Sequence, residues 1–102
     1  MKLIKLDLDN TSIKMQGDKV VEEFAEWIQA RTLEDKLEES WDVIQAMLHY
    51  ILKHTHEEVR ISNREHIKKL EYRESKGGHV ITHYVKLKFS KKTGEESKKL
   101  LK

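Results

Sequence analysis

Apolar and polar positions along the chain follow two different periods. Between residues 18 and 76, apolar side chains recur every three or four positions, which is the spacing of a helix that buries one side. Residues 1–8 and 79–89 instead alternate between apolar and polar, as half-buried strands do. We therefore expect an all-α fold: a bundle of three main helices, with a small two-stranded β addition made from the chain ends. The remaining residues, 90–102, form a charged tail.

The first helix is predicted over about residues 19–31, with Asp18 as its N-cap. Its apolar stripe consists of Val20, Val21, Phe24, Trp27 and Ile28. At about 100° of rotation per residue, Glu23 and Glu26 fall on one flank of this stripe. Glu22 falls nearly opposite the stripe and is expected to face water.

The second helix begins with Thr32 and Asp35, whose spacing resembles a capping box. Its main apolar stripe, which we expect to be core, consists of Leu33, Leu37, Trp41, Ile44, Leu48, Ile51 and Leu52. Over residues 43–52 the helix is apolar nearly all round, which is typical of a central helix that neighbours bury on several sides. Glu39 and Asp42 lie on another side, which is continued by Val43, Ala46 and Tyr50. That second side must also pack, either on the first helix or on a second subunit.

The third helix has two possible starts. A capping-box spacing at Thr55 and Glu58 predicts one helix over about residues 56–75. A second such spacing shortly afterwards allows a short turn followed by a helix from Asn63. In either case the apolar stripe is thin, the other face is basic, and Gly77-Gly78 ends the helix.

Composition narrows the class of protein. At 102 residues the chain is expected to be one domain, residues 1–102, with a helical core over about 18–76 that would gain from oligomerisation. The absence of cysteine excludes disulfides and thiolate metal sites. The net charge of +2 creates no strong field, so nucleic acid is not expected as a partner. Nothing resembles a signal peptide or a membrane span, and a cytoplasmic protein without a membrane partner is expected.

Acidic residues recur at a defined spacing on the first two predicted helices. Residues 22–26 are EEFAE, and after a gap of twelve residues, 39–42 are ESWD. Carboxylates three residues apart point the same way on a helix. The plainer interpretation is that these acidic residues form the solvated face of an ordinary helical hairpin. Against it, Glu39 and Asp42 share a side with apolar residues, where unpaired carboxylates are costly. A hard divalent cation with oxygen ligands, Mg²⁺ or Mn²⁺, removes this cost.

This pattern, EExxE followed after a gap by ExxD, resembles the motif of the all-α nucleoside triphosphate pyrophosphohydrolases. That superfamily includes MazG, the dimeric dUTPases, the dCTP pyrophosphatases and the phosphoribosyl-ATP pyrophosphatases. The chain is most similar to short MazG-like proteins, over roughly residues 18–73. The resemblance implies Mg²⁺-dependent hydrolysis of a nucleoside triphosphate to the monophosphate and pyrophosphate, in nucleotide-pool control. It also implies a homodimer or homotetramer, and as metal ligands Glu23, Glu26, Glu39 and Asp42.

The resemblance further implies that the following helix supplies groups for the phosphates. The candidates in this chain are Asn63, Lys68, Lys69 and Arg73. Either Glu23 or Glu26 could accept the proton of the attacking water, and the sequence leaves this choice open.

Two alternatives remain. The chain could be a non-catalytic helical oligomer that acts through its basic tail as a nucleic-acid or protein binding module. It could also carry another chemistry of the superfamily, such as hydrolysis of dUTP or phosphoribosyl-ATP. The histidines show no ligand spacing, and we expect them to be structural or on the surface. Which nucleotide is the substrate depends on a pocket whose residues lie far apart in the sequence.

Overall fold

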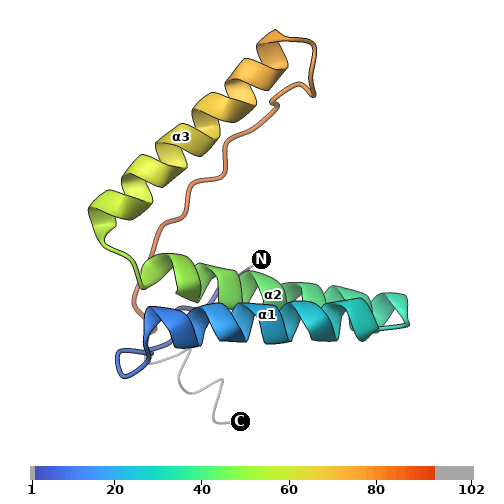
Figure 1. Cartoon of the computed structure of the whole chain (residues 1–102), viewed down its shortest axis with the longest axis vertical. Helices are drawn as coiled ribbons and strands as arrows, with labels where there is room; N and C mark the ends of the chain where they lie inside the picture. Colours follow the sequence, from blue (N-terminus) through green and yellow to red (C-terminus); the bar gives the residue numbers. More distant parts are fainter. Residues whose placement is uncertain (1, 94–102) are drawn as a thin grey trace. The chain divides into compact units, whose positions relative to one another are not determined.

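The structure, a computed structural model, describes residues 2–93 and contains three helices there: α1 (Ile13–Gln29), α2 (Leu33–Leu52) and α3 (His56–Ser75) (Figure 1). The prediction of an all-α fold with three main helices is confirmed. The chain divides into two compact units, Met1–Lys68 and Lys69–Lys102, with the boundary inside α3. None of the helices in the described residues is long and apolar enough to cross a membrane.

Helix α1 begins earlier than its apolar stripe predicts. Its N-cap is Ser12, whose hydroxyl accepts a hydrogen bond from the backbone N–H of Met15 at 3.0 Å. The prediction of Asp18 as the N-cap is therefore wrong, because the Ser12 hydroxyl already satisfies an N–H of the first turn. Asp18 lies inside the helix and pairs with Lys14 at 2.9 Å. Gly17, also inside α1, faces Tyr50 of α2, and a Cβ placed there would lie 3.5 Å from the tyrosine ring.

Helices α2 and α3 begin at the predicted caps. The Thr32 hydroxyl accepts from the N–H of Asp35 at 3.0 Å. At the start of α3, Thr55 and Glu58 form a reciprocal capping box with distances of 3.0 and 3.1 Å. One continuous helix follows, so the alternative start at Asn63 is wrong. Gly77 ends α3 with a φ of 88°, a left-handed conformation that glycine adopts without steric cost.

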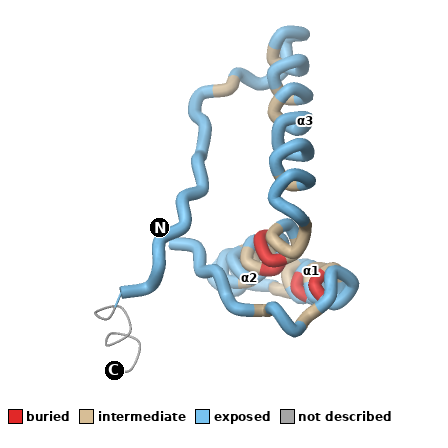
Figure 2. Tube along the Cα trace, turned by 90° about the vertical axis from the view of Figure 1, so that its left-hand side faces the viewer, coloured by how far each residue is buried: buried red, intermediate tan, exposed pale blue. Residues whose placement is uncertain are grey.

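Helices α1 and α2 run antiparallel and pack side by side (Figure 1). Figure 2 shows the buried positions on α1 and α2; they are Gln16 and Glu23 of α1 and Ala46, Leu48 and His49 of α2. Across the contact, the Trp27 indole N–H donates to the Ser40 hydroxyl at 2.9 Å. The Lys36 ammonium lies 4.4 Å from the centroid of the Trp27 ring and donates to the Trp27 carbonyl.

The side of α2 that packs on α1 is the second one, which carries Ala46. The main apolar stripe instead remains largely exposed: Leu37 is 57% exposed and Trp41 is 44% exposed. The prediction that Trp41 is core is therefore wrong for the chain by itself, whereas Leu48 of the same stripe is buried. On the side that faces α1, Gly17 leaves room for the Tyr50 ring, which a larger side chain at this position would occupy.

The chain ends form no strand within residues 2–93, so the predicted two-stranded addition is not present there. Alternation describes a side chain's environment, but a strand also needs a neighbour whose N–H and C=O groups complete the ladder. In the first unit, the amide of Gln45 donates to the Ile4 carbonyl and ties the N-terminal segment to α2. In the second unit, the Ile81 N–H donates to the Glu74 carboxylate. Most of the predicted charged tail, residues 94–102, lies outside the described residues.

Candidate metal centre

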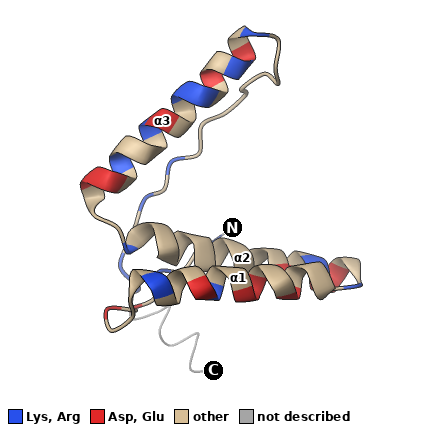
Figure 3. Cartoon of the chain, in the orientation of Figure 1, with Lys and Arg blue, Asp and Glu red and all other residues tan. Residues whose placement is uncertain are grey.

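Acidic residues gather along α1 and the neighbouring part of α2 (Figure 3). Glu23, Glu39 and Asp42 each offer a carboxylate oxygen, and these atoms lie within 4.8 Å of one another. We call these three residues the interhelix triad. Carboxylates of consecutive antiparallel helices therefore meet, as the spacing of the two acidic motifs predicts. Glu39 and Asp42 stand three residues apart on α2, and Glu23 reaches them from α1.

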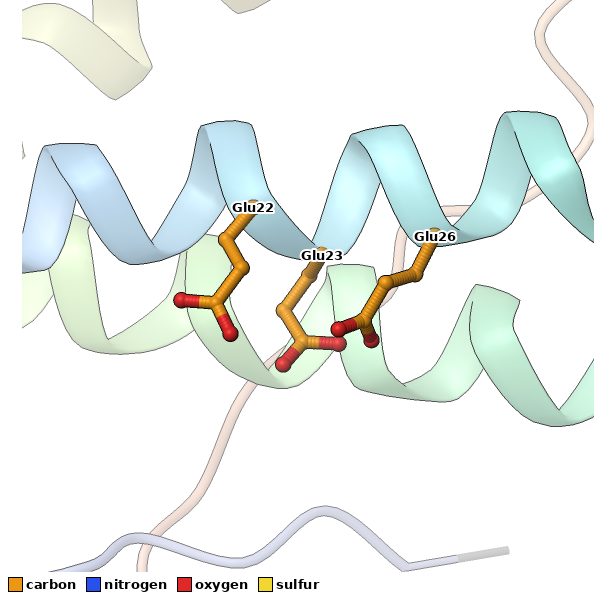
Figure 4. A group of neighbouring side chains, drawn as sticks. All are labelled: Glu22, Glu23 and Glu26. Carbon is orange, nitrogen blue, oxygen red and sulfur yellow. The ribbon is translucent and has the colours of Figure 1, made fainter.

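A second acidic group lies along α1 itself. The carboxylates of Glu22, Glu23 and Glu26 also lie within 4.8 Å of one another (Figure 4). Glu23 therefore belongs to both groups, and Glu26 is adjacent to the triad without being part of it. Glu22 was expected to face water away from the site. It is exposed, but its long side chain brings the carboxylate back to Glu23, which an angle measured at the backbone does not capture.

Burial makes two of the triad oxygens costly. Glu23 is only 8% exposed and Glu39 is half-buried, whereas Asp42 is exposed. One oxygen of Glu23 and one of Glu39, both named Oε2, are buried and have no hydrogen-bond partner among the described residues. A buried polar atom without a partner loses its hydration without compensation, and the loss is larger when the group is charged. A cation bound between these two oxygens would compensate this loss.

Lys19 is the cation nearest to the acidic groups in the described residues. Its ammonium lies 2.8 Å from Oε1 of Glu23 and 3.3 Å from Oε1 of Glu22. The hydrogen bond to Glu23 raises the pKa of Lys19, so this amine stays charged. Sequence analysis overlooked Lys19, although its position four residues before Glu23 is the usual spacing of a helical ion pair. The contacts of Lys19 reach one oxygen of Glu23 and one of Glu22, and neither contact is to Glu39.

Like charges within the cluster raise the pKa of two carboxyl groups. For Glu26 the largest cause is the neighbouring charge of Glu23, and Glu39 adds to it. For Glu39 the largest cause is burial, followed by the charges of Asp42 and Glu23. Both shifts favour the protonated, neutral form. The acidic groups of α1 and α2 therefore repel one another in the folded chain.

The donor set fits a hard divalent cation. All the atoms are carboxylate oxygens, which suit Mg²⁺ and Mn²⁺, and the two groups found in the described residues contain no histidine. Oxygens within 4.8 Å of one another can also bind one ion at the usual distance of about 2.1 Å with small side-chain adjustments. The buried oxygens without partners supply the energetic reason for binding.

A pocket of about 370 Å³ adjoins the triad and shares Glu23 and Asp42 with it. Its walls come from the N-terminal segment, α1 and α2, and they are mostly apolar. The remaining polar lining includes two glutamines and a histidine: Gln16, Gln45 and His49. The sequence pattern does not reveal this pocket, because its alternation predicts a strand for the N-terminal segment and the histidines show no ligand spacing.

The candidates for phosphate binding lie on α3. Asn63 and Lys68 are exposed in the first unit, and Lys68 lies 3.7 Å from Glu65 of the same helix. Lys69 and Arg73 are exposed on the remainder of α3, in the second unit. The role of these four residues in phosphate binding stays a prediction.

Comparisons of the chain with family models, with curated proteins and with solved structures found no match. The case for a function therefore depends on the interhelix triad, on Lys19 and on the adjoining pocket.

Proposed function

We propose that the chain is a Mg²⁺-dependent nucleoside triphosphate pyrophosphohydrolase that converts a (d)NTP and water to the (d)NMP and pyrophosphate, as its resemblance to MazG-like proteins implies. The observation that carries this proposal is the pair of buried, unpartnered carboxylate oxygens of Glu23 and Glu39. They lie on adjacent helices and belong to one group with Asp42. A triphosphate is strongly negative, so such a group can hold it only through a cation.

Glu23, Glu39 and Asp42 would hold the Mg²⁺, with Mn²⁺ as a possible substitute, and Glu26 stands beside them. When bound, the ion would neutralise charge on the phosphates and lower the pKa of a water molecule. Glu26 is the better candidate for the general base, because it lies outside the triad and is exposed. Its pKa is raised by Glu23, which makes the carboxylate a stronger acceptor of the water's proton.

Lys19 has a role that follows from its present partner. Its ammonium bonds to Glu23, the residue shared by both acidic groups, and it also lines the pocket. If a bound cation compensated the charge of Glu23, Lys19 would be released and could contact an outer phosphate oxygen of the substrate. The contribution of Asn63, Lys68, Lys69 and Arg73 to phosphate binding is a separate prediction, which follows from the resemblance alone.

The direct test is pyrophosphate release from each of the four common dNTPs, with Mg²⁺ and with EDTA in its place. We expect Mg²⁺-dependent release that is lost in Glu39→Gln and retained in Glu34→Gln, an exposed acid of the first turn of α2. Absence of release with every nucleotide would overturn the proposal. Salt-dependent binding to DNA or RNA by such an inactive protein would favour the alternative, a nucleic-acid binding module.

We also propose that the chain works as a homodimer or homotetramer. Large apolar side chains are exposed along α1, at Val21, Phe24 and Ile28, and along α2, at Leu33, Leu37, Trp41, Ile44 and Ile51. They recur at helical spacing, so they form rows rather than scattered single residues. Rows of this kind on a soluble helical hairpin favour burial against another helical surface, and a second copy supplies one of matching chemistry.

A further inference from the structure

The pocket beside the triad has the position of a second subsite. It shares Glu23 and Asp42 with the triad, so a ligand whose phosphates approach the carboxylates through a cation would extend its other end into this space. Its volume of about 370 Å³ falls in the range of pockets that hold small organic ligands. This inference rests on the proposed function, because that function supplies a ligand with one charged end and one largely uncharged end.

The lining suits a flat, weakly polar group rather than a phosphate. Leu6 and Leu8 of the N-terminal segment, Met15 of α1 and Ala46 of α2 make the apolar walls. Lys19, the cation in the lining, lies at the end shared with Glu23. A nucleobase and the carbon face of a sugar match such walls, whereas charged phosphates match only the acidic end with its cation.

Gln45 has a defined hydrogen-bonding state in this pocket. Its side-chain nitrogen donates to the Ile4 carbonyl, which can only accept, and this settles which end of the amide is the nitrogen. The same nitrogen lies 2.7 Å from Nε2 of His49, so that ring nitrogen accepts and the imidazole proton is on Nδ1. Both N–H groups of Gln45 are thereby used. What Gln45 can offer a ligand is its carbonyl oxygen, an acceptor.

Gln16 complements Gln45. It is only 5% exposed, and its nitrogen donates to the Thr11 hydroxyl at 2.8 Å, which leaves one N–H and the amide oxygen for other partners. His49 is 6% exposed, and burial lowers its pKa, which agrees with the neutral ring that Gln45 requires. Buried amides that keep both donor and acceptor capacity are the groups that recognise the hydrogen-bonding edge of a base.

We propose that this pocket binds the nucleoside of the substrate, and that Gln16 and Gln45 recognise its base. The N-terminal segment forms one wall of the subsite, and the bond from Gln45 to Ile4 holds that wall in place. His49 is a positioning residue, because it orients the Gln45 amide.

The first experiment detects binding without catalysis. The four deoxynucleosides, which carry no phosphate, are titrated into the ¹⁵N-labelled full chain in EDTA, and NMR spectra record the side-chain amide signals. We expect at least one nucleoside to shift the signals of Gln16 and Gln45. The signal of Gln29, which is exposed at the end of α1, should stay in place. If all four nucleosides leave Gln16 and Gln45 unmoved at millimolar concentration, the subsite is overturned.

The second experiment measures selectivity during turnover. Gln45→Met keeps the length of the side chain but cannot hydrogen-bond like an amide, and Gln29→Met is the matched control. For the preferred dNTP we expect Gln45→Met to raise KM about tenfold, to flatten the preference among bases, and to keep kcat within about twofold. Gln16→Met should act in the same direction, which keeps the test valid if one variant folds poorly.

The outcomes separate the subsite from the proposed function. Pyrophosphate release with unchanged KM and base preference in both glutamine variants would overturn the subsite and leave the enzyme intact. Nucleoside shifts at Gln16 and Gln45 in a chain that releases no pyrophosphate would support the subsite and overturn the enzyme.

Discussion

The two sides of α2 contrast in composition and in burial. The side that packs on α1 carries Ala46, His49 and the carboxylate of Glu39, and much of it is buried. The outer side carries Leu37 and Trp41 and is largely exposed. The more apolar side is therefore not the one that the chain buries by itself. Apolar area alone does not choose the partner of a helix, because small residues and matched polar groups also decide how closely two backbones can approach.

This difference places the candidate site. The contact between α1 and α2 is close where Gly17 meets Tyr50, and it is joined by the hydrogen bond between Trp27 and Ser40. Carboxylates held in such a contact cannot all turn toward water. Their burial and mutual repulsion therefore lower the stability of the folded chain. The inner side of α2 is thus suited to ligand chemistry and the outer side to association, and each side can be tested separately.

The largest effect is expected from Glu39→Gln on the inner side. The variant should lose Mn²⁺ affinity by at least about a hundredfold, because a ligand oxygen is replaced by a weaker one. Without metal it should melt a few degrees higher than wild type, because a buried carboxylate oxygen without a partner is removed. Calorimetric titration and thermal melts in EDTA measure the two quantities, with Glu34→Gln as control. A fall in both metal affinity and melting temperature would show that Glu39 acts in folding rather than in a metal site.

Trp41→Glu tests the outer side. If the apolar rows of α1 and α2 hold subunits together, a charge at this half-exposed position should convert the assembly to a monomer of 12.1 kDa in sedimentation velocity. The control is Val80→Glu, which changes an apolar residue of the second unit that is 75% exposed. A wild-type chain that already sediments as a monomer at about 100 μM would remove the assembly from the proposal.

Lys19→Met tests whether the lysine competes with a metal for Glu23. Removal of this ion pair should tighten Mn²⁺ binding by up to about fivefold, which is the size expected for a pair whose lysine is half-exposed. Lys14→Met is the matched control, because Lys14 makes a similar pair with Asp18 on α1, four residues apart, at 2.9 Å. Weaker Mn²⁺ binding in Lys19→Met alone would mean that Lys19 organises the carboxylates instead of competing for them.

The difference in melting temperature between Glu39→Gln and wild type should also depend on pH, and this is a smaller effect. The pKa of Glu39 is raised in the folded state from its ordinary 4.5, so folding favours its protonated form. In EDTA, the wild type gains this stability as pH falls through the raised pKa, and the gain is complete below 4.5. The gap should therefore be widest at about pH 8 and shrink toward pH 5. The shift of His49 does not involve Glu39 and cancels in the difference, whereas the pKa of Glu26 is raised in part by Glu39 and changes the gap in the same direction. A gap that stays constant with pH would contradict the buried charge.

Gly17→Ala has the smallest expected effect and tests the closeness of the inner contact. A Cβ at this position would lie 3.5 Å from the Tyr50 ring, which is an ordinary contact. The substitution should raise the free energy of unfolding by up to about 1 kcal/mol, since alanine is the better helix former. Gly77→Ala is the opposite control, because its φ of 88° disfavours a side chain. Urea denaturation measures both, and destabilisation by Gly17→Ala would mean that the helices approach more closely at Tyr50.

The sequence by itself determined the three helices and most of their ends. Thr32, Thr55 and Gly77 act through hydrogen bonds or backbone conformations that involve only a few neighbouring residues, so their effect is visible in the chain. Ser12 acts in the same local way, but the pair Gly17-Asp18 resembled a helix start and hid it. The spacing of the two acidic motifs predicted that four carboxylates of two helices would meet, and three of them, Glu23, Glu39 and Asp42, form one group.

Only the tertiary structure decided which side of α2 faces α1. The contact of Gly17 with Tyr50, for example, joins residues that lie far apart in the sequence. The tertiary structure also decided that Glu22 and Lys19 lie beside Glu23, and that the N-terminal segment bounds a pocket. The predicted strands did not form within residues 2–93, because alternation does not supply a ladder partner. Local hydrogen bonds and helical periodicity are properties of a segment, whereas close packing and shared pockets are properties of pairs of segments.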